Sequence, residues 1–262
     1  MKQRIITAIL AMIVFIPFVL YGHWPFILFV YFLATIGLFE LMRMKRLPVL
    51  SLPGITGFAF LWIALLPGST HFVFTKSEWI VLFSLLLLTY TVLSKNKFTM
   101  EDAGFVMLAM VYVAMGFYYF MEARTQSGDE GLATVFLVLF IVWATDTGAY
   151  FVGKAIGKNK LWPEISPNKT IEGALGGILL ACVVGLVFQM IHPFHYGFLA
   201  IAGTAILISI VGQMGDLVES AFKRYFGVKD SGNLLPGHGG ILDRLDSVLF
   251  VFPVLHLIHF IG

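Results

Sequence analysis

Residues 172–192 read Glu172-Gly-Ala-Leu-Gly-Gly-Ile-Leu-Leu-Ala-Cys-Val-Val-Gly-Leu-Val-Phe-Gln-Met-Ile-His192. About 20 apolar residues in a helix are enough to cross the hydrocarbon core of a bilayer. In hydrocarbon every backbone N–H and C=O must be satisfied within the protein, so a long apolar run is expected to be helical. The segment therefore predicts a transmembrane helix.

The composition of the whole chain also indicates a membrane protein. Of its 262 residues, 59% are hydrophobic and 12% are charged, whereas a soluble domain carries about 25% charged residues. These charges are too few to cover a water-soluble surface, and a net charge of +2 does not indicate nucleic-acid binding. We therefore expect membrane lipids, and no nucleic acid, as partners of this chain.

Further apolar runs predict an all-α polytopic integral membrane protein with about nine transmembrane helices. The first run follows Met1-Lys-Gln-Arg4 and lacks a small-residue cleavage site, so it is interpreted as an uncleaved helix and not as a signal peptide. The predicted spans are residues 5–22, 24–42, 53–68, 78–94, 104–121, 134–153, 172–192, 196–215 and 247–262.

Basic residues determine the predicted orientation, because they collect in the cytosolic loops of membrane proteins. With a cytosolic N-terminus and alternating spans, all of the 17 basic residues except Lys76 and Arg124 lie on the cytosolic side. We therefore expect the C-terminus to lie outside.

The two halves of the chain differ in their polar chemistry. Residues 1–130 are interpreted as plain transmembrane helices. Residues 131–262 are interpreted as a catalytic transmembrane region with two cytosolic loops, 154–171 and 216–246.

Asp146 is a charged residue within the apolar run Trp143-Ala-Thr-Asp-Thr-Gly148. A charge at such a place costs at least about 2.5–3.5 kcal/mol on insertion scales. We expect Asp146 to face a polar interior and to have a functional role. The alternative is a structural hydrogen bond to Thr145 or Thr147.

Carboxylates are concentrated beside the predicted span 196–215. Helical spacing at i, i+3, i+4 and i+7 places four residues on one face, namely Asp216, Glu219, Ser220 and Lys223. Asp243 and Asp246 are also one helical turn apart. Such a set of oxygen ligands suits Mg²⁺, a hard cation. The alternative is that the carboxylates only pair with Lys223, Arg224 and Arg244.

A glycine-rich turn, Pro236-Gly-His-Gly-Gly240, precedes Asp243. Glycines allow positive φ and close backbone approach, so successive N–H groups at Gly239 and Gly240 could bind phosphate. His238 is expected to contact phosphate or nucleotide. The alternative is a tight turn that His238 merely stabilises.

The segment Ser166-Pro-Asn-Lys-Thr170 leads into the predicted span 172–192. Ser166 or Thr170 could cap this helix, whose N-terminus favours anions. Lys169 beside that positive end favours an anion site over capping alone.

The most specific segment reads Ser220-Ala-Phe-Lys-Arg-Tyr-Phe-Gly-Val-Lys-Asp-Ser-Gly-Asn-Leu-Leu-Pro-Gly-His-Gly-Gly-Ile-Leu-Asp-Arg-Leu-Asp246. It resembles the signature of the phosphatidate cytidylyltransferases, the CDP-diacylglycerol synthases. The matching positions are Ser220, Lys223, Arg224, Lys229, Asp230, Gly232, Pro236, His238, Gly239, Gly240, Asp243, Arg244 and Asp246. Upstream, Asp146 and residues 166–173 are also similar to the family, and the motif-bearing part covers about residues 140–250.

The resemblance implies transfer of CMP from CTP to phosphatidate, which gives CDP-diacylglycerol and pyrophosphate. It also implies a homodimer. We expect a bacterial-type inner membrane and an active site that faces the cytosol, because both polar loops lie on the predicted cytosolic side. Such a reaction brings two polyanions together, so cations must neutralise the charge of the transition state.

Candidate residues follow from this requirement. We expect Mg²⁺, as one ion or as two about 3.5–4 Å apart, at Asp216 and Asp243 with Asp146 or Asp246. The expected catalytic residues are Asp146, Lys169, Asp216, Lys223, Asp243 and Arg244. The expected substrate-binding residues are Ser166, Thr170, Arg224, Lys229, His238, Gly239 and Gly240.

Other classes of membrane protein fit the sequence less well. A transporter or channel would explain Asp146, but the polar residues cluster toward one side and no inverted repeat is evident. A CDP-alcohol phosphotransferase would need a second aspartate pair after Asp243-Arg-Leu-Asp246, and none follows. A lipid or polyprenol kinase is a weaker alternative.

Overall fold

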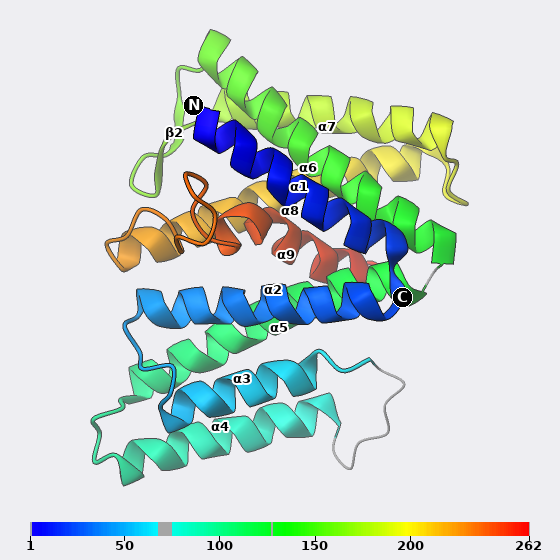
Figure 1. The fold of residues 1–262 in the computed structure, drawn as a ribbon. Coiled ribbons are helices and arrows are strands. Elements are labelled where there is room, and N and C mark those ends of the chain that lie inside the picture. Colours follow the sequence, from blue (N-terminus) through cyan, green and yellow to red (C-terminus); the bar gives the residue numbers. More distant parts are fainter. Residues whose placement is uncertain (1, 68–74, 127, 262) are drawn as a thin grey trace. The chain divides into compact units, whose positions relative to one another are not determined.

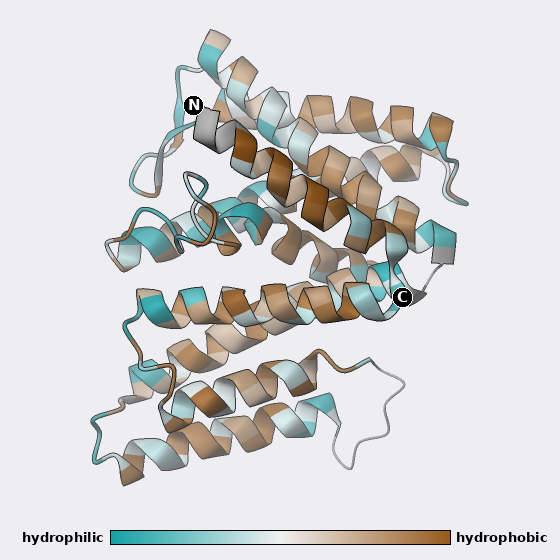
Figure 2. Ribbon diagram, in the orientation of Figure 1, coloured by the Kyte–Doolittle hydropathy of each residue, from teal (hydrophilic) through white to brown (hydrophobic). Residues whose placement is uncertain are grey.

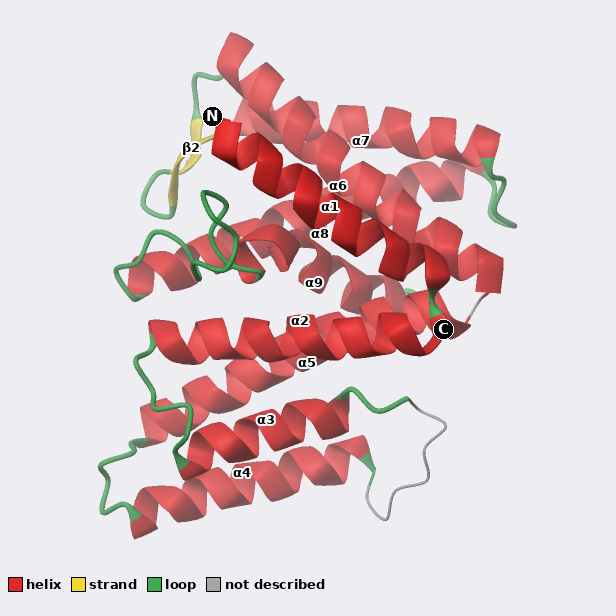
Figure 3. Ribbon diagram, viewed as in Figure 1, coloured by secondary structure: helices red, strands yellow, loops and turns green. Residues whose placement is uncertain are grey.

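The computed structural model describes residues 2–67, 75–126 and 128–261. Within these ranges the chain forms nine helices and one two-stranded hairpin (Figure 1, Figure 3). The helices are α1 Lys2–Tyr21, α2 His23–Met44, α3 Leu52–Ala64, α4 Lys76–Leu93, α5 Met100–Gln126, α6 Gly128–Ile156, α7 Ile171–Ile191, α8 Phe198–Tyr225 and α9 Leu242–Leu257.

The length and apolar composition of these helices support the prediction of a multi-pass membrane protein. Six of the described helices are long and apolar enough to cross a bilayer, namely α2, α4, α5, α6, α7 and α8. Figure 2 shows hydrophobic residues along most of α7. The apolar part of α1, Ile6–Tyr21, and the helix α3 are shorter. Nine membrane crossings and the sides on which the termini lie stay predictions.

Helices α6 and α7 pack closely because glycines remove side chains from their contact. A Cβ at Gly148 would lie 2.7 Å from the carbonyl oxygen of Gly176, and a Cβ at Gly177 would lie 2.7 Å from that of Thr145. Small residues at such a contact let helix backbones approach closely in a membrane. This contact places Thr145, and therefore the neighbouring Asp146, beside α7.

The chain is consistent with the predicted all-α membrane protein, and it adds one short hairpin that the sequence analysis did not predict. In the predicted loop 154–171, β1 Lys160–Trp162 pairs antiparallel with β2 Ser166–Thr170. These strands are short and polar, so they carry no alternating apolar pattern by which they could be recognised.

Both ends of the predicted cytosolic loop 216–246 belong to helices. Helix α8 continues to Tyr225, ten residues past the predicted end of its span at residue 215, and α9 begins at Leu242. An ion pair between Glu219 and Lys223, one turn apart, stabilises the extension of α8. Within this predicted loop, residues 226–241 lie outside helices.

The chain divides into two compact units. The first contains Met1–Met121 and Asp230–Leu242, so the glycine-rich turn folds with the N-terminal helices. The second contains Glu122–Lys229 and Asp243–Gly262, and it therefore holds α6, the hairpin, α7, α8 and nearly all of α9.

The predicted orientation can be tested by cysteine labelling of intact cells. Lys158 and Asn233 are exposed and lie in the two predicted cytosolic segments. In a Cys182→Ala background, we expect Lys158→Cys and Asn233→Cys to resist an impermeant maleimide. Ser77→Cys, beside Lys76 on the predicted outer side, is the matched control and should react. Ready labelling at position 158 or 233 would overturn the orientation.

Candidate active site

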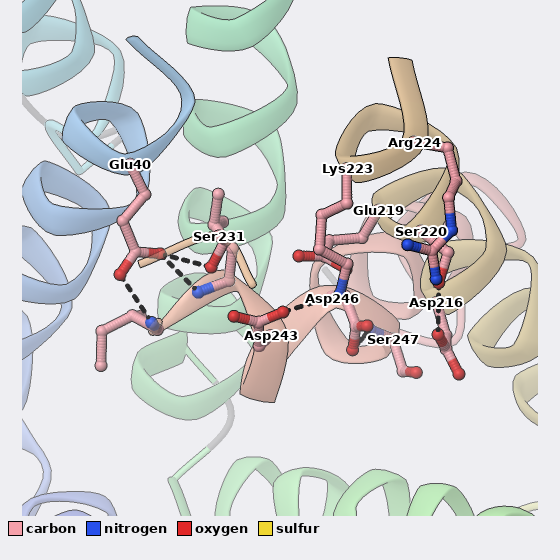
Figure 4. A network of polar contacts seen from close by, with 12 residues as sticks. Glu40, Asp216, Glu219, Ser220, Lys223, Arg224, Ser231, Asp243, Asp246 and Ser247 are labelled. Atoms are coloured by element: carbon pink, nitrogen blue, oxygen red, sulfur yellow. Dashed lines mark hydrogen bonds and ion pairs between the residues drawn. The ribbon is translucent and has the colours of Figure 1, made fainter. Parts of the chain in front are cut away.

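The last turns of α8 present polar side chains on one face, as the helical spacing predicts. The Ser220 hydroxyl donates to Oδ1 of Asp216 at 3.4 Å. One turn further along, the Lys223 ammonium pairs with the Glu219 carboxylate. Figure 4 shows Asp216, Glu219, Ser220 and Lys223 along this part of α8.

Lys223 also connects α8 to α9. Its Nζ donates to Oδ1 of Asp243 at 2.7 Å. The exposed fractions of the three side chains are 13% for Lys223, 0% for Glu219 and 5% for Asp243. Charges so far from water interact strongly, since the surroundings are only weakly polar. Glu219 and Asp243 therefore both pair with a basic residue, and metal binding by Asp243 stays a prediction.

Lys169 connects the hairpin to α8. It lies on β2, and its Nζ donates to Oδ2 of Asp216 at 2.5 Å. The next residue, Thr170, caps α7 by accepting the Gly173 N–H at 3.1 Å. Thr170, and not Ser166, is therefore the cap, and Lys169 has Asp216 as its ionic partner.

Asp146 belongs to the same charged cluster. It is close enough to Asp216, Lys169 and Arg244 to interact with each electrostatically. A hydrogen bond of 2.9 Å from Thr145 Oγ1 to Ser209 Oγ joins α6 to α8 close to Asp146.

Asp146 faces polar surroundings, as predicted, although its side chain remains accessible and is not fully enclosed. The hydroxyl groups of Thr145 and Thr147 donate to the backbone carbonyls of Ile141 and Trp143, and Thr145 also donates to Ser209. The structure therefore gives no support to a hydrogen-bond hub at Asp146.

Asp246 completes the group of carboxylates, because it interacts electrostatically with Asp216, Asp146 and Lys223. The second unit therefore brings together all the residues that the sequence predicts as catalytic or metal-binding. They are Asp146, Lys169, Asp216, Lys223, Asp243, Arg244 and Asp246.

Two further predicted binding residues lie on the exposed surface of the second unit. Arg224 is exposed, and its Nε donates to the carbonyl oxygen of Ile165, beside the hairpin, at 3.2 Å. Lys229 is exposed in the loop after α8. Both side chains are therefore accessible to a ligand from water.

The glycine-rich turn forms as predicted, within the first unit. The Leu235 N–H donates to the carbonyl of Gly239 at 2.9 Å, and the His238 N–H donates to that of Leu235 at 2.8 Å. Gly237 and Gly239 have φ of 76° and 84°, a conformation that favours glycine. Gly240 is buried beside the turn. Phosphate binding by His238, Gly239 and Gly240 stays a prediction.

The chemistry of the charged cluster suits magnesium, although the structure shows no preformed cage. Among the described residues, no group of three or more His, Cys, Asp or Glu side chains could hold a metal ion. Mg²⁺ does not need such a cage, since proteins usually bind it through one or two carboxylates, substrate phosphates and water. Asp146, Asp216 and Asp246 repel one another, and a divalent cation would relieve that repulsion.

Two acidic residues were missed among the predicted site residues. Glu219 was predicted on the polar face and within the set of oxygen ligands, but not as a site residue, and it is the fully buried partner of Lys223. Glu40 is a lone carboxylate inside the predicted span 24–42. A charge in an apolar span is by default a sign of function, and this signal could have identified it.

Comparisons with known proteins agree with the resemblance in the motifs. The model of the Cytidylyltransferase family matches residues 2–261. The chain is 50% identical to the phosphatidate cytidylyltransferase of Bacillus subtilis, over 98% of this chain and 97% of that protein. It is 47% identical to the protein of the same name from Staphylococcus epidermidis and 46% identical to that from Staphylococcus aureus, over 98% of both chains in each case. The similarity therefore includes the N-terminal helices.

The ion pairs of Lys223 lead to a prediction about stability. Lys223→Ala leaves the buried carboxylate of Glu219 without its cation, and removing one partner of a buried pair costs about 3–5 kcal/mol. We expect a loss of this size in the free energy of unfolding, measured by denaturation in detergent micelles. Adding Glu219→Gln should restore much of it. Lys160→Ala, an exposed control, should change stability by less than about 0.5 kcal/mol. Equal stability of the two lysine variants would contradict the buried pair.

Proposed function

The chain belongs to the cytidylyltransferase family, and on that premise we propose that it transfers CMP from CTP to phosphatidate. The products are CDP-diacylglycerol and pyrophosphate, in phospholipid biosynthesis. The observation that carries the proposal is the cluster of alternating charges at the ends of α8 and α9, within a chain that resembles phosphatidate cytidylyltransferases over nearly its whole length. Family membership favours this reaction over a transporter, a phosphotransferase of another type or a kinase.

The reaction explains why the site combines both signs of charge. The phosphate of phosphatidate is already an anion at neutral pH, so its attack on the α-phosphorus of CTP needs no strong base. The difficulty is the repulsion between two polyanions, which fixed cations must reduce. Lys169, Lys223 and Arg244 supply positive charge, and the carboxylates that surround them keep these cations in place before the substrates bind.

Magnesium is the cofactor that this donor set would take. Asp216 with Asp146 or Asp246 would hold the ion, and Asp243 would join them if its bond to Lys223 opened. When bound, Mg²⁺ would neutralise charge on the CTP phosphates. Lys169 pairs with the same carboxylate of Asp216, and we assign it to neutralise charge on a substrate phosphate beside that carboxylate.

The two substrates differ in how they reach the site. Phosphatidate stays in the membrane, and CTP arrives from water. Arg224 is assigned to the lipid phosphate, because its planar guanidinium suits a phosphate at the headgroup level. Lys229, Ser166 and Thr170 are assigned to substrate phosphates, and the turn with His238 to the nucleotide. We further propose a cytosolic site in a bacterial inner membrane and a homodimeric enzyme.

A reconstituted assay tests the proposed reaction. Purified protein in mixed micelles receives CTP labelled in its α-phosphate, phosphatidate and Mg²⁺, and a labelled liponucleotide is the expected product. No product should form without phosphatidate. Failure to form it in the complete mixture, with folded protein, would overturn the proposed function.

Metal dependence gives a separate prediction. Chelation should abolish turnover and added Mg²⁺ should restore it. Asp216→Asn removes ligand charge with little change of shape, and we expect kcat to fall by at least about 100-fold. Glu164→Gln is the matched control, since Glu164 is an exposed carboxylate in the turn of the hairpin. Near-normal activity of Asp216→Asn would remove Asp216 from the metal site.

The role of Arg224 predicts a difference between the two substrates. Arg224→Lys keeps the charge but loses the guanidinium fork. We expect KM for phosphatidate to rise about tenfold, because one charge-assisted hydrogen bond is lost. KM for CTP should stay unchanged. Arg43→Lys, an exposed control on the predicted cytosolic side, should change neither. A larger rise in KM for CTP would assign Arg224 to the nucleotide.

A further inference from the structure

Glu40 is a buried carboxylate in α2 that holds a segment about 200 residues away in the sequence. Its side chain is 2% exposed. Oε1 accepts the N–H of Ile241 at 2.9 Å, and Oε2 accepts the N–H of Leu242 at 3.0 Å. Oε2 also accepts a hydrogen bond of 3.0 Å from the hydroxyl group of Ser231. Figure 4 shows Glu40 and Ser231, with dashed lines that converge on the Glu40 carboxylate.

The two amides explain why a negative charge is stable at this position. Ile241 and Leu242 stand at the start of α9, where backbone N–H groups have no partner within the helix. The positive end of a helix favours an anion. Together these hydrogen bonds offset the cost of burying the carboxylate. Glu40 acts as the cap of a helix to which it is not adjacent in sequence.

The Glu40 carboxylate leaves no room for a side chain at two glycine positions of the segment. A Cβ at Gly232 would lie 2.5 Å from Oε1 of Glu40, and a Cβ at Gly240 would collide with both Glu40 and the Ser231 hydroxyl. Any larger residue at either position would displace the carboxylate. This gives Gly240 a structural requirement apart from the phosphate binding predicted for it.

We infer that Glu40 is a positioning residue for the reaction, an inference that rests on the proposed function. It closes the segment Ser231–Leu242 into a loop and holds Leu242, which is followed directly by Asp243. The Thr7 hydroxyl supports the same loop by donating to the carbonyl of Pro236 at 3.0 Å. Glu40 thereby fixes the glycine-rich turn and the start of α9 without contacting substrate.

Glu40→Gln tests this role with the whole protein in micelles. The amide keeps the shape of the side chain, but its NH₂ group faces donors and cannot accept from them. We expect kcat to fall about 10–100-fold, as for residues that orient active-site groups. Hydrogen exchange at the amides of Ile241 and Leu242 should rise at least about tenfold, whereas exchange in the rest of α2 should stay as in the wild type.

Leu41→Ala is the matched control, because Leu41 is 1% exposed and adjacent to Glu40 in α2. It should lower the unfolding temperature but leave kcat and the exchange of residues 241 and 242 unchanged. Ser231→Ala removes the hydrogen bond from the hydroxyl group to Glu40 and should give a smaller loss of kcat. This loss should not add to that of Glu40→Gln. If Glu40→Gln does not fold, Ser231→Ala decides the question by the same two measurements.

Two results would overturn the inference. One is wild-type kcat with wild-type exchange in Glu40→Gln, or in Ser231→Ala if the first variant does not fold. The other is an equal loss of kcat in Leu41→Ala and Glu40→Gln when the two variants have the same unfolding temperature. Inactivity of the wild type would instead overturn the proposed function, and the exchange measurement would still test whether Glu40 holds the segment.

Discussion

The charged part of this protein depends on one ammonium group, that of Lys223. It binds Glu219 on its own helix and Asp243 at the start of α9. Lys223 stabilises both carboxylates, because removing one partner of a buried pair leaves an uncompensated charge. The same pairs explain why α8 continues well beyond its apolar part. The arrangement of acids and bases around it follows from this bridge.

Close packing of helices brings Asp146, Lys169 and Asp216 into one cluster. Glycines let the backbones of α6 and α7 approach, and the hydroxyls of Thr145 and Ser209 join α6 to α8. Asp146 and Asp216 are then near enough to repel each other, and Lys169 on the hairpin offsets part of that repulsion. The result is a cluster of mixed sign, which suits two polyanions and a divalent cation better than charges of one sign would.

The first unit stabilises a buried acid by another means. Glu40 accepts hydrogen bonds from two backbone amides and from a hydroxyl group. Gly232 and Gly240 leave the room that its carboxylate needs. Part of a motif that resembles a phosphate-binding turn is therefore explained by contacts within the protein. A glycine-rich sequence does not by itself distinguish these two reasons for glycine.

Local patterns were sufficient for the helices and for the polar face of α8. Apolar length predicts a helix because backbone groups must be satisfied within the segment, and the face from Asp216 to Lys223 depends only on helical spacing. The hairpin at Lys160–Thr170 was missed because its strands are short and polar. The partners of the charges depend on how distant segments pack: Lys169 and Asp216 are 47 residues apart, and Glu40 and Ile241 are 201 apart. Such pairs leave no periodic trace in the sequence, so only the folded chain reveals them.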